Sequence, residues 1–291
     1  MSKSANIGII ILLLLALTSG CTPGAVSDNL VVAIPTDPDG FHPHQSVAAA
    51  SAEIAFNIFE GLVKAAPDGS IIPALATDWE ISSDGLQYTF TLREGVKFHN
   101  GRALTAADVV YCLKRLIDPE ITAKARDYTG VVSIKNRGNK VIITLSKRDA
   151  AFLALLTEFG ASIYPPEAEE MLSTQPIGTG PFVLTNWEPN NQLTLTKFEQ
   201  YWQPELPKLN EIVLKIIPEP ATAVNGLRTG HVDLVPRLEP DYLHQVINEQ
   251  NLKIIDSPMN LVQLLAINNA RPPFDDIRVR QALNYAIDRE K

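Results

Sequence analysis

The sequence has few cysteines, few aromatic residues and no excess of basic residues. Its 291 residues include 2 cysteines, and 7% of the residues are aromatic. Two cysteines are too few for a disulfide framework or a four-cysteine zinc site. Lys and Arg number 25 against 33 Asp and Glu, which gives a formal net charge of −8. This balance lacks the basic surface typical of nucleic-acid-binding proteins, so we expect no nucleic-acid partner.

One apolar run stands near the N-terminus, Ile7–Leu17, and its 11 residues carry no charge. A spanning helix needs about 20 apolar residues, whereas the core of a secretory signal needs about 7–15. The run is followed by Thr18-Ser19-Gly20-Cys21, and small residues before a cysteine at this place resemble the bacterial lipoprotein signal. In such signals the cysteine is diacylated and becomes the new N-terminus. The alternative is an ordinary signal peptide with an incidental cysteine.

We therefore expect residues 1–20 to be a lipoprotein signal peptide, Cys21 to be the lipidation site and residues 21–29 to be a flexible tether. The protein would be exported and lipid-anchored, at the outer face of the plasma membrane or in the periplasm. The other cysteine, Cys112, lies on the apolar stripe of a predicted helix. We interpret it as a buried structural residue rather than a reactive thiol.

The rest of the chain mixes strands and helices without a strict alternation. Three pairs of predicted strands flank turn residues and form hairpins, and they cover 79–92, 131–145 and 182–198. Further strands are predicted over 30–34, 210–217, 232–235, 252–256 and 261–268, and helices over 48–59, 105–116, 150–159, 221–228, 239–247 and from Asp275 onward. Thr105 and Asp108 stand at capping-box spacing at the start of the second helix. The last helix has Asp275 as its predicted N-cap and an apolar stripe of Val279, Ala282, Leu283 and Ala286. This pattern favours an α/β core interrupted by a hairpin-rich subdomain.

Signatures of catalysis are absent from the sequence: it contains no HExxH, GxSxG, GK[ST] or CxxC motif. His42 and His44 stand two residues apart, but two imidazoles are too few for a metal site. The stretch Gly178–Pro181 is better explained as a tight turn than as a phosphate cradle, because Pro181 has no backbone N–H to donate. We predict that the protein is not an enzyme and holds no cofactor and no metal.

Several stretches, read in order, resemble family 5 of the extracellular solute-binding proteins, the peptide/nickel type. Members of this family are receptor lipoproteins of ABC importers. The longest matching block, Phe59–Arg115, contains EGLV, PALA, DG, YTF and GVKFH at the family's spacing. The stretches that carry the rest of the resemblance are Pro176–Leu184, Tyr201–Trp202 and Arg278–Glu290. The loop PTDPDGFHPH departs from the family's "LDPH" pattern, since Phe41 and His42 replace its Leu and Asp.

The resemblance implies an α/β, periplasmic-binding-protein-like fold of type II, with two lobes that close around a ligand. Lobe I would comprise residues 30–267, with an α/β core at 30–59 and 176–267 and an inserted hairpin-rich subdomain at 60–175. Residues 268–291 would begin lobe II. We expect a truncated form, because the family's second lobe follows the helix at which this sequence stops.

The function implied is capture of peptides, or of a related small solute such as nickel or a sugar, for delivery to an ABC transporter permease. The alternative is a single-lobe exported lipoprotein that acts as an interaction or sensing module. The candidate ligand-binding residues lie in the loop after the first strand and in the glycine turn, where crevices form in α/β folds. They are Thr36, Phe41, His44, Gly178, Thr179, Gly180 and Phe182. A purely structural role for both turns remains open.

Overall fold

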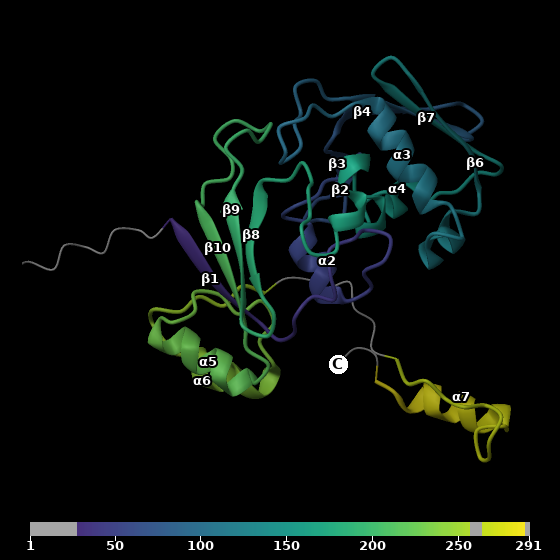
Figure 1. Cartoon of the computed structure of the whole chain (residues 1–291). Helices are drawn as coiled ribbons and strands as arrows, with labels where there is room; N and C mark the ends of the chain where they lie inside the picture. The colour runs from purple at the N-terminus through teal and green to yellow at the C-terminus, as the bar shows by residue number, and fades with distance from the viewer. Residues whose placement is uncertain (1–27, 257–263, 289–291) are drawn as a thin grey trace, which may run out of the picture. The chain divides into compact units, whose positions relative to one another are not determined.

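The computed structural model describes residues 28–256 and 264–288. The chain divides into two compact units, Met1–Asn248 and Glu249–Lys291, and each is described by itself. The first unit contains the sheets and most of the helices (Figure 1). The predicted boundary between lobes, at residues 267 and 268, stays a prediction. Cys21 and the signal peptide lie outside the described residues.

A four-stranded mixed sheet, sheet A, forms the core of the first unit. Its strands are β1 (Asn29–Ile34), β10 (Glu211–Ile216), β9 (Gln192–Lys197) and β8 (Phe182–Glu188), in that spatial order. β1 and β10 are parallel, and the other neighbouring pairs are antiparallel. Figure 1 shows these strands side by side, with α5 (Pro220–Thr229) below them. The predicted hairpin over 182–198 is confirmed as β8 and β9, with a bulge at Thr185.

A second four-stranded sheet, sheet C, lies within the predicted subdomain and is wholly antiparallel. Its order is β4 (Ala76–Ile81), β5 (Gln87–Leu92), β7 (Lys140–Leu145) and β6 (Val131–Arg137). The alternation expected from the sequence is present, because Tyr88, Phe90 and Leu92 are buried whereas the threonines between them are partly exposed. A two-stranded sheet of β2 (Val63–Ala65) and β3 (Ile71–Pro73) joins this region to the core.

Helix α3 (Ala106–Leu116) covers sheet C through β6 and β7. Its start was predicted from a capping box, which the structure confirms: the backbone N–H of Thr105 donates to Asp108 Oδ2 at 2.8 Å. Asp108 is buried and also pairs with Arg102, with 2.8 Å between Arg102 Nη2 and Asp108 Oδ1. The carboxylate thus stabilises both the helix terminus and the preceding loop.

The remaining helices are short. They are α2 (Ala49–Ala55), η2 (Ala123–Tyr128), α4 (Phe152–Leu155), η3 (Phe159–Ala161), η4 (Pro166–Met171), η5 (Pro240–Tyr242) and α6 (Leu243–Val246). One buried apolar cluster runs from sheet A to sheet C and includes residues of both. The core and the subdomain are therefore packed together as one body within the first unit.

Several predicted elements differ from the structure. Residues 252–256 and 264–268 form no strand, so those predictions are wrong for the described residues. The strand predicted over 232–235 is a single parallel bridge between Val32 and Leu234. The helix predicted over 48–59 ends at Ala55, and that over 239–247 is divided into η5 and α6. Short apolar runs do not distinguish a strand from an irregular segment unless a neighbouring strand pairs with them.

The second unit contains α7 (Ile277–Ala286). Its N-cap is Asp276, whose carboxylate accepts from Arg278 N at 2.8 Å, and not Asp275 as the sequence predicted. No residue of α7 is buried, and the exposed fraction of Tyr285 is 89%. The predicted apolar stripe of this helix is therefore not buried: Val279 and Leu283 are partly exposed, and Ala282 and Ala286 are exposed.

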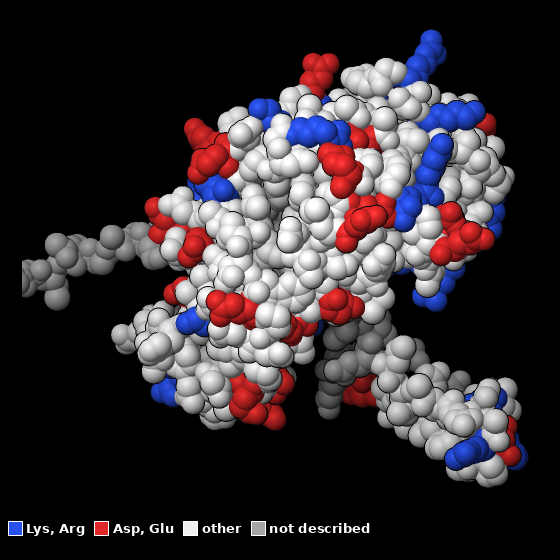
Figure 2. Space-filling model, viewed as in Figure 1, with Lys and Arg blue, Asp and Glu red and all other residues white. Residues whose placement is uncertain are grey.

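Charged side chains of both signs are interspersed over the face shown in Figure 2, with wide uncharged areas between them. No continuous basic surface is present on that face. No helix among residues 28–256 and 264–288 has the length and apolar character needed to span a membrane.

Candidate functional site

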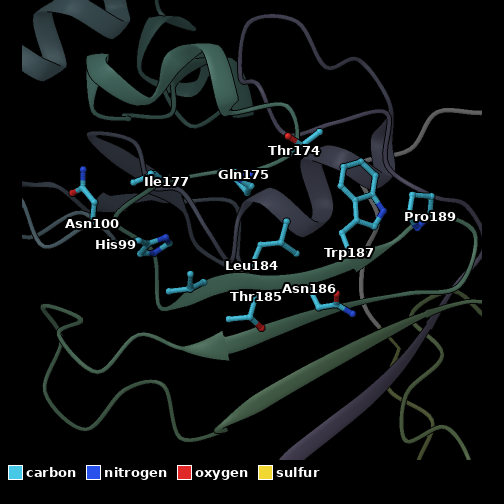
Figure 3. A pocket seen from close by; sticks show the side chains of 12 residues that line it. His99, Asn100, Thr174, Gln175, Ile177, Leu184, Thr185, Asn186, Trp187 and Pro189 are labelled. Carbon is cyan, nitrogen blue, oxygen red and sulfur yellow. The ribbon is translucent and has the colours of Figure 1, made fainter.

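One pocket of the first unit lies beside β8, an edge strand of sheet A (Figure 3). This β8 pocket has a volume of about 700 Å³, and its floor includes Leu184 and Trp187. Two of its polar side chains are already paired: His99 Nε2 and Gly180 O lie 3.0 Å apart, and Trp187 Nε1 donates to Asp37 at 3.0 Å. Burial lowers the pKa of His99 to about 4, so the imidazole is neutral at pH 7. The lining contains no acidic or basic side chain other than this histidine.

Helix α2 stands between two other grooves. The sheet-side groove, about 320 Å³, lies between α2 and sheet A. It is lined by Leu30, Val32, Ile34, Pro35, Thr36, Ala49, Ala50, Glu53, Ile54, Asn57, Ile212, Leu214, Leu234, Pro236 and Arg237. The helix-side groove, about 530 Å³, lies between the start of α2 and η2 and η3. Val47 lines it, and its side chain is largely exposed.

A third concavity, the strand-end pocket, lies where β1 and β10 end. It has a volume of about 280 Å³ and is lined by residues of α5 and of the segment 235–242. The strand-end pocket and the sheet-side groove share five residues, among them Glu53 and Arg237, which form an ion pair. Because β1 and β10 are parallel, their carboxyl ends meet at one edge of sheet A, where ligands of α/β proteins bind. We assign the candidate site to these concavities around α2.

The loop before α2 is fixed by Asp39, a residue that the sequence analysis missed. Its carboxylate accepts from Ser51 Oγ at 2.6 Å and from the backbone N–H groups of Val47 and Ala48 at 2.9 and 3.1 Å. Burial acts to raise the pKa of Asp39, but these hydrogen bonds outweigh it and the pKa is lowered. One feature of the sequence could have revealed this role. The N-cap residue of α2 is Ala48, whose side chain cannot cap the helix, and an aspartate stands a few residues before it.

Two predicted residues of this loop, Phe41 and His44, are directed into the interior. Phe41 is fully buried and packs edge-on against Trp187, with 5.4 Å between ring centroids. His44 Nδ1 lies 3.2 Å from Tyr164 Oη, and burial lowers the pKa of His44 to about 3. Neither residue lines the concavities around α2, whereas Thr36 does. Their role in ligand binding stays a prediction, and the contacts show that they hold the loop.

His42 and His44 do not form a metal site. Their rings lie 5.6 Å apart, and His42 Nε2 is 3.7 Å from Glu169 Oε1. Glu169 itself pairs with Arg115 and Tyr111. Among the residues that the structure describes, no group of three or more His, Cys, Asp or Glu could hold a metal ion.

The glycine turn 178–180 is packed against the backbone that follows α2. A Cβ atom on Gly178 would lie 2.1 Å from Ile58 O, and one on Gly180 would lie 2.7 Å from Asn57 O. The turn leads into β8 at Phe182, as predicted. Thr179 is fully buried and donates to Glu60 Oε2 at 3.0 Å. The turn joins core to subdomain, and no residue of it lines the concavities around α2.

Glu60 is the centre of a buried polar network that the sequence analysis also missed. Besides Thr179, it accepts from Tyr201 Oη at 2.9 Å and from Trp202 Nε1 at 2.9 Å. Burial raises the pKa of Glu60, while the three donors oppose that shift. Arg93 lies over the Trp202 ring, 4.0 Å from its centroid. The EGLV and YW motifs, which lie far apart in the sequence, thus contact each other in the structure. Glu60 of EGLV is the acceptor, and Tyr201 and Trp202 of YW are the donors.

Cys112 is buried, as predicted, and its Sγ donates to Tyr164 O at 3.2 Å. Burial raises the pKa of this thiol well above its usual range, so the nucleophilic thiolate is absent at neutral pH.

The family assignment follows from comparison with known proteins. The sequence model described as "Bacterial extracellular solute-binding proteins, family 5 Middle" matches residues 70–291. The chain belongs to family 5 of the bacterial extracellular solute-binding proteins. This confirms the resemblance found in the sequence. The family is one of binding proteins, which confirms the prediction that the chain is not an enzyme.

Curated relatives of this family 5 chain include heme-binding protein A of Haemophilus influenzae, which is 33% identical over 285 residues. That alignment covers 87% of this chain and 52% of the relative. The glutathione-binding protein GsiB of Escherichia coli (strain K12) is 29% identical, with 94% of this chain and 54% of the relative covered. The chain spans about half the length of the curated relatives it matches.

Solved structures give the same fold. A dipeptide-binding protein from Pseudoalteromonas sp. SM9913, in complex with Met-Leu, superposes with a TM-score of 0.77 at 26% identity, covering 90% of this chain and 57% of that one. NikZ from Campylobacter jejuni, in complex with Ni(L-His), gives a TM-score of 0.78 at 25% identity, with 91% and 54% covered. The predicted type II binding-protein fold is confirmed, over about half of each neighbour.

Proposed function

We propose that this family 5 chain is part of the receptor of an ABC importer and captures a peptide-like solute outside the plasma membrane. Cys21 would carry the lipid that anchors the protein, and a membrane permease would take the solute from it. The observation that supports this function most directly is the set of concavities around α2. Two of them, the sheet-side groove and the strand-end pocket, combine apolar walls with the ion pair of Glu53 and Arg237, which is the composition expected of a small-solute site.

The walls of the sheet-side groove come from three separate segments: β1, β10 and α2. Such a surface is fixed by the packing of the core and needs no rearrangement to exist. In a two-lobed binding protein, the ligand is enclosed when a second lobe closes over a surface of this kind. Closure is driven by contacts that the ligand makes only in the closed state.

The test is a thermal-shift screen on protein expressed from the uninterrupted reading frame that contains this sequence. The panel would hold dipeptides to hexapeptides, glutathione, heme and Ni²⁺ with histidine. A ligand at about 100 times its Kd stabilises the folded state by about 2.7 kcal/mol. That gain raises Tm by several degrees. We expect such a shift from at least one peptide, and no shift from any peptide would contradict the proposal.

The lipid anchor has its own test. Wild-type protein and the Cys21→Ser variant would be produced in bacteria and separated by detergent phase partition. We expect wild type in the detergent phase with an added mass of fatty acyl groups, and the variant in the aqueous phase. Equal partition of the two proteins would contradict lipidation at Cys21.

A further inference from the structure

Sheet C has an outer face on the side away from α3. Helix α3 packs against β6 and β7, and side chains of the central strands such as Phe90 and Ile143 are buried with it in the apolar cluster. Their neighbours in sequence, Thr89 and Ile142, point the other way and are partly exposed. The outer face therefore carries no helix among the described residues, and its side chains are available for contact.

The two edges of the outer face carry charges of opposite sign. In one cross-strand row, Glu80 of β4 lies beside Thr89 of β5, which is followed by Ile142 of β7 and Lys135 of β6. Glu80 and Lys135 are exposed. Among the described residues, neither of them takes part in an ion pair. An acid therefore stands at one end of the row and a base at the other, with two uncharged side chains between them.

The next row repeats this order. From β4 to β6 it consists of Asp78, Thr91, Lys140 and Arg137. Hydrogen bonds from Thr77 and Thr91 lower the pKa of Asp78, and the positive charge of Lys140 acts in the same direction. The carboxylate is thus ionised at neutral pH. Both rows place negative charge on β4 and positive charge toward β6.

We propose that the outer face of sheet C is a self-association surface, and that its partner is a second copy of this chain related by a two-fold axis parallel to the strands. Two sheets stacked face to face about such an axis place β4 of one copy over β6 of the other. Glu80 then faces the partner's Lys135, and Asp78 faces the partner's Arg137. Each contact forms twice, because a two-fold interface uses the same surface on both copies. This inference goes beyond the proposed function and does not depend on the solute.

The distribution of charge selects this axis. An axis perpendicular to the strands would place β4 over β4, so that the acidic side chains of the two copies repel one another. Stacked sheets lie about 10 Å apart, with their strands within about 30° of each other. Extended Glu80 and Lys135 side chains meet across such a gap, and Thr89 and Ile142 pack against each other between them.

The size of the outer face predicts a weak and reversible dimer. Four strands of about six residues span roughly 20 Å in each direction. A contact of this area belongs with small, transient interfaces, so we expect a Kd on the order of 10–100 µM. Exposed charges supply much of the attraction, and salt weakens it because the Debye length falls from about 10 Å at 0.1 M to about 3 Å at 1 M.

The experiment is sedimentation velocity over about 5–300 µM protein, a range that brackets this Kd. Protein is expressed from the uninterrupted reading frame in the Cys21→Ser background, which removes the predicted lipid. We expect the sedimentation coefficient to rise from monomer toward dimer with concentration, and to stay at the monomer value in 1 M NaCl.

Charge reversal tests the contact itself. Glu80→Lys and Lys135→Glu each oppose like charges across the face, and each should weaken association about tenfold or more. An equimolar mixture of the two variants should associate within threefold of the unreversed protein. In that mixed dimer, Lys at position 80 and Lys135 of one copy both face a glutamate of the other.

Matched controls are Lys114→Glu and Glu120→Lys, which reverse exposed residues on or just after α3, on the other side of sheet C. Both should associate as the unreversed protein does. Thr89→Arg places a bulky charge at the centre of the face and leaves the strand edges free, so it should abolish stacking. Urea unfolding checks that each variant is folded.

Three outcomes would overturn the inference. The first is a monomer at every concentration, and the second is a dimer that the reversals leave unchanged or that survives Thr89→Arg, which would indicate pairing along strand edges. The third is a mixture that fails to associate although each single reversal weakens the dimer, because Glu80 would then not face the partner's Lys135. None of these outcomes bears on solute binding, so the proposed function is tested separately.

Discussion

The close packing of the glycine turn gives the sharpest test of the fold. In Gly178→Ala the new Cβ would lie 2.1 Å from Ile58 O and 2.8 Å from both Ile58 C and a ring carbon of Phe59. Two of these atoms are backbone, so no flexible side chain can move aside. Overpacking of this kind costs about 1–3 kcal/mol and sometimes more. We expect a loss of about 3 kcal/mol in the free energy of unfolding.

The matched control is Gly130→Ala. Gly130 has no positive φ, and a Cβ there would meet nothing within 4 Å. Replacing it should leave stability unchanged or raise it by about 0.4–1 kcal/mol, because alanine restricts the unfolded chain. Urea unfolding, followed by far-UV circular dichroism, measures both variants. A loss below about 1 kcal/mol in Gly178→Ala would refute the packing assigned to this turn, and a selective loss of ligand binding at unchanged stability would favour the predicted ligand role instead.

Two further predictions concern buried groups. Burial holds the pKa of His44 at about 3, below the unfolded value of about 6.5, so the unfolded state binds the proton first and stability falls as pH drops below 6.5. The slope should be about 1.4 kcal/mol per pH unit between pH 6 and 4, and urea titrations of wild type and His44→Gln should differ by that slope. A common slope would contradict the neutral buried imidazole. Cys112, in a Cys21→Ser background, should react with iodoacetamide only after denaturation; modification of the folded protein would show that the thiol is accessible.

Much of the fold follows from local signals in the sequence. The hairpins of sheet C were predicted because turn residues separate alternating apolar positions, and α3 was predicted from Thr105 and Asp108 at capping-box spacing. The incorrect strands at residues 252–256 and 264–268 show the limit of such signals. An apolar run becomes a strand only when another strand pairs with it, and periodicity does not report that pairing.

The candidate site was predicted only in part. The loop after β1 was correctly located at a strand end, but its predicted side chains Phe41 and His44 are directed inward, where they pack against Trp187 and Tyr164. Glu53 and Arg237 are separated by 184 positions, and nothing local indicates that they meet. The network of Glu60 was missed for the same reason, since its donors come from three distant positions.

The location of the binding site is tested most directly by amide hydrogen exchange, measured by mass spectrometry with and without a peptide that stabilises the protein. A solute bound around α2 should slow exchange in peptides that cover residues 47–54 and 234–238, most of which line the grooves. Exchange beside β8, at residues 174–177 and 183–187, should change little. Protection confined to the β8 pocket, with exchange around α2 unaltered, would contradict the site assigned to this solute-binding protein.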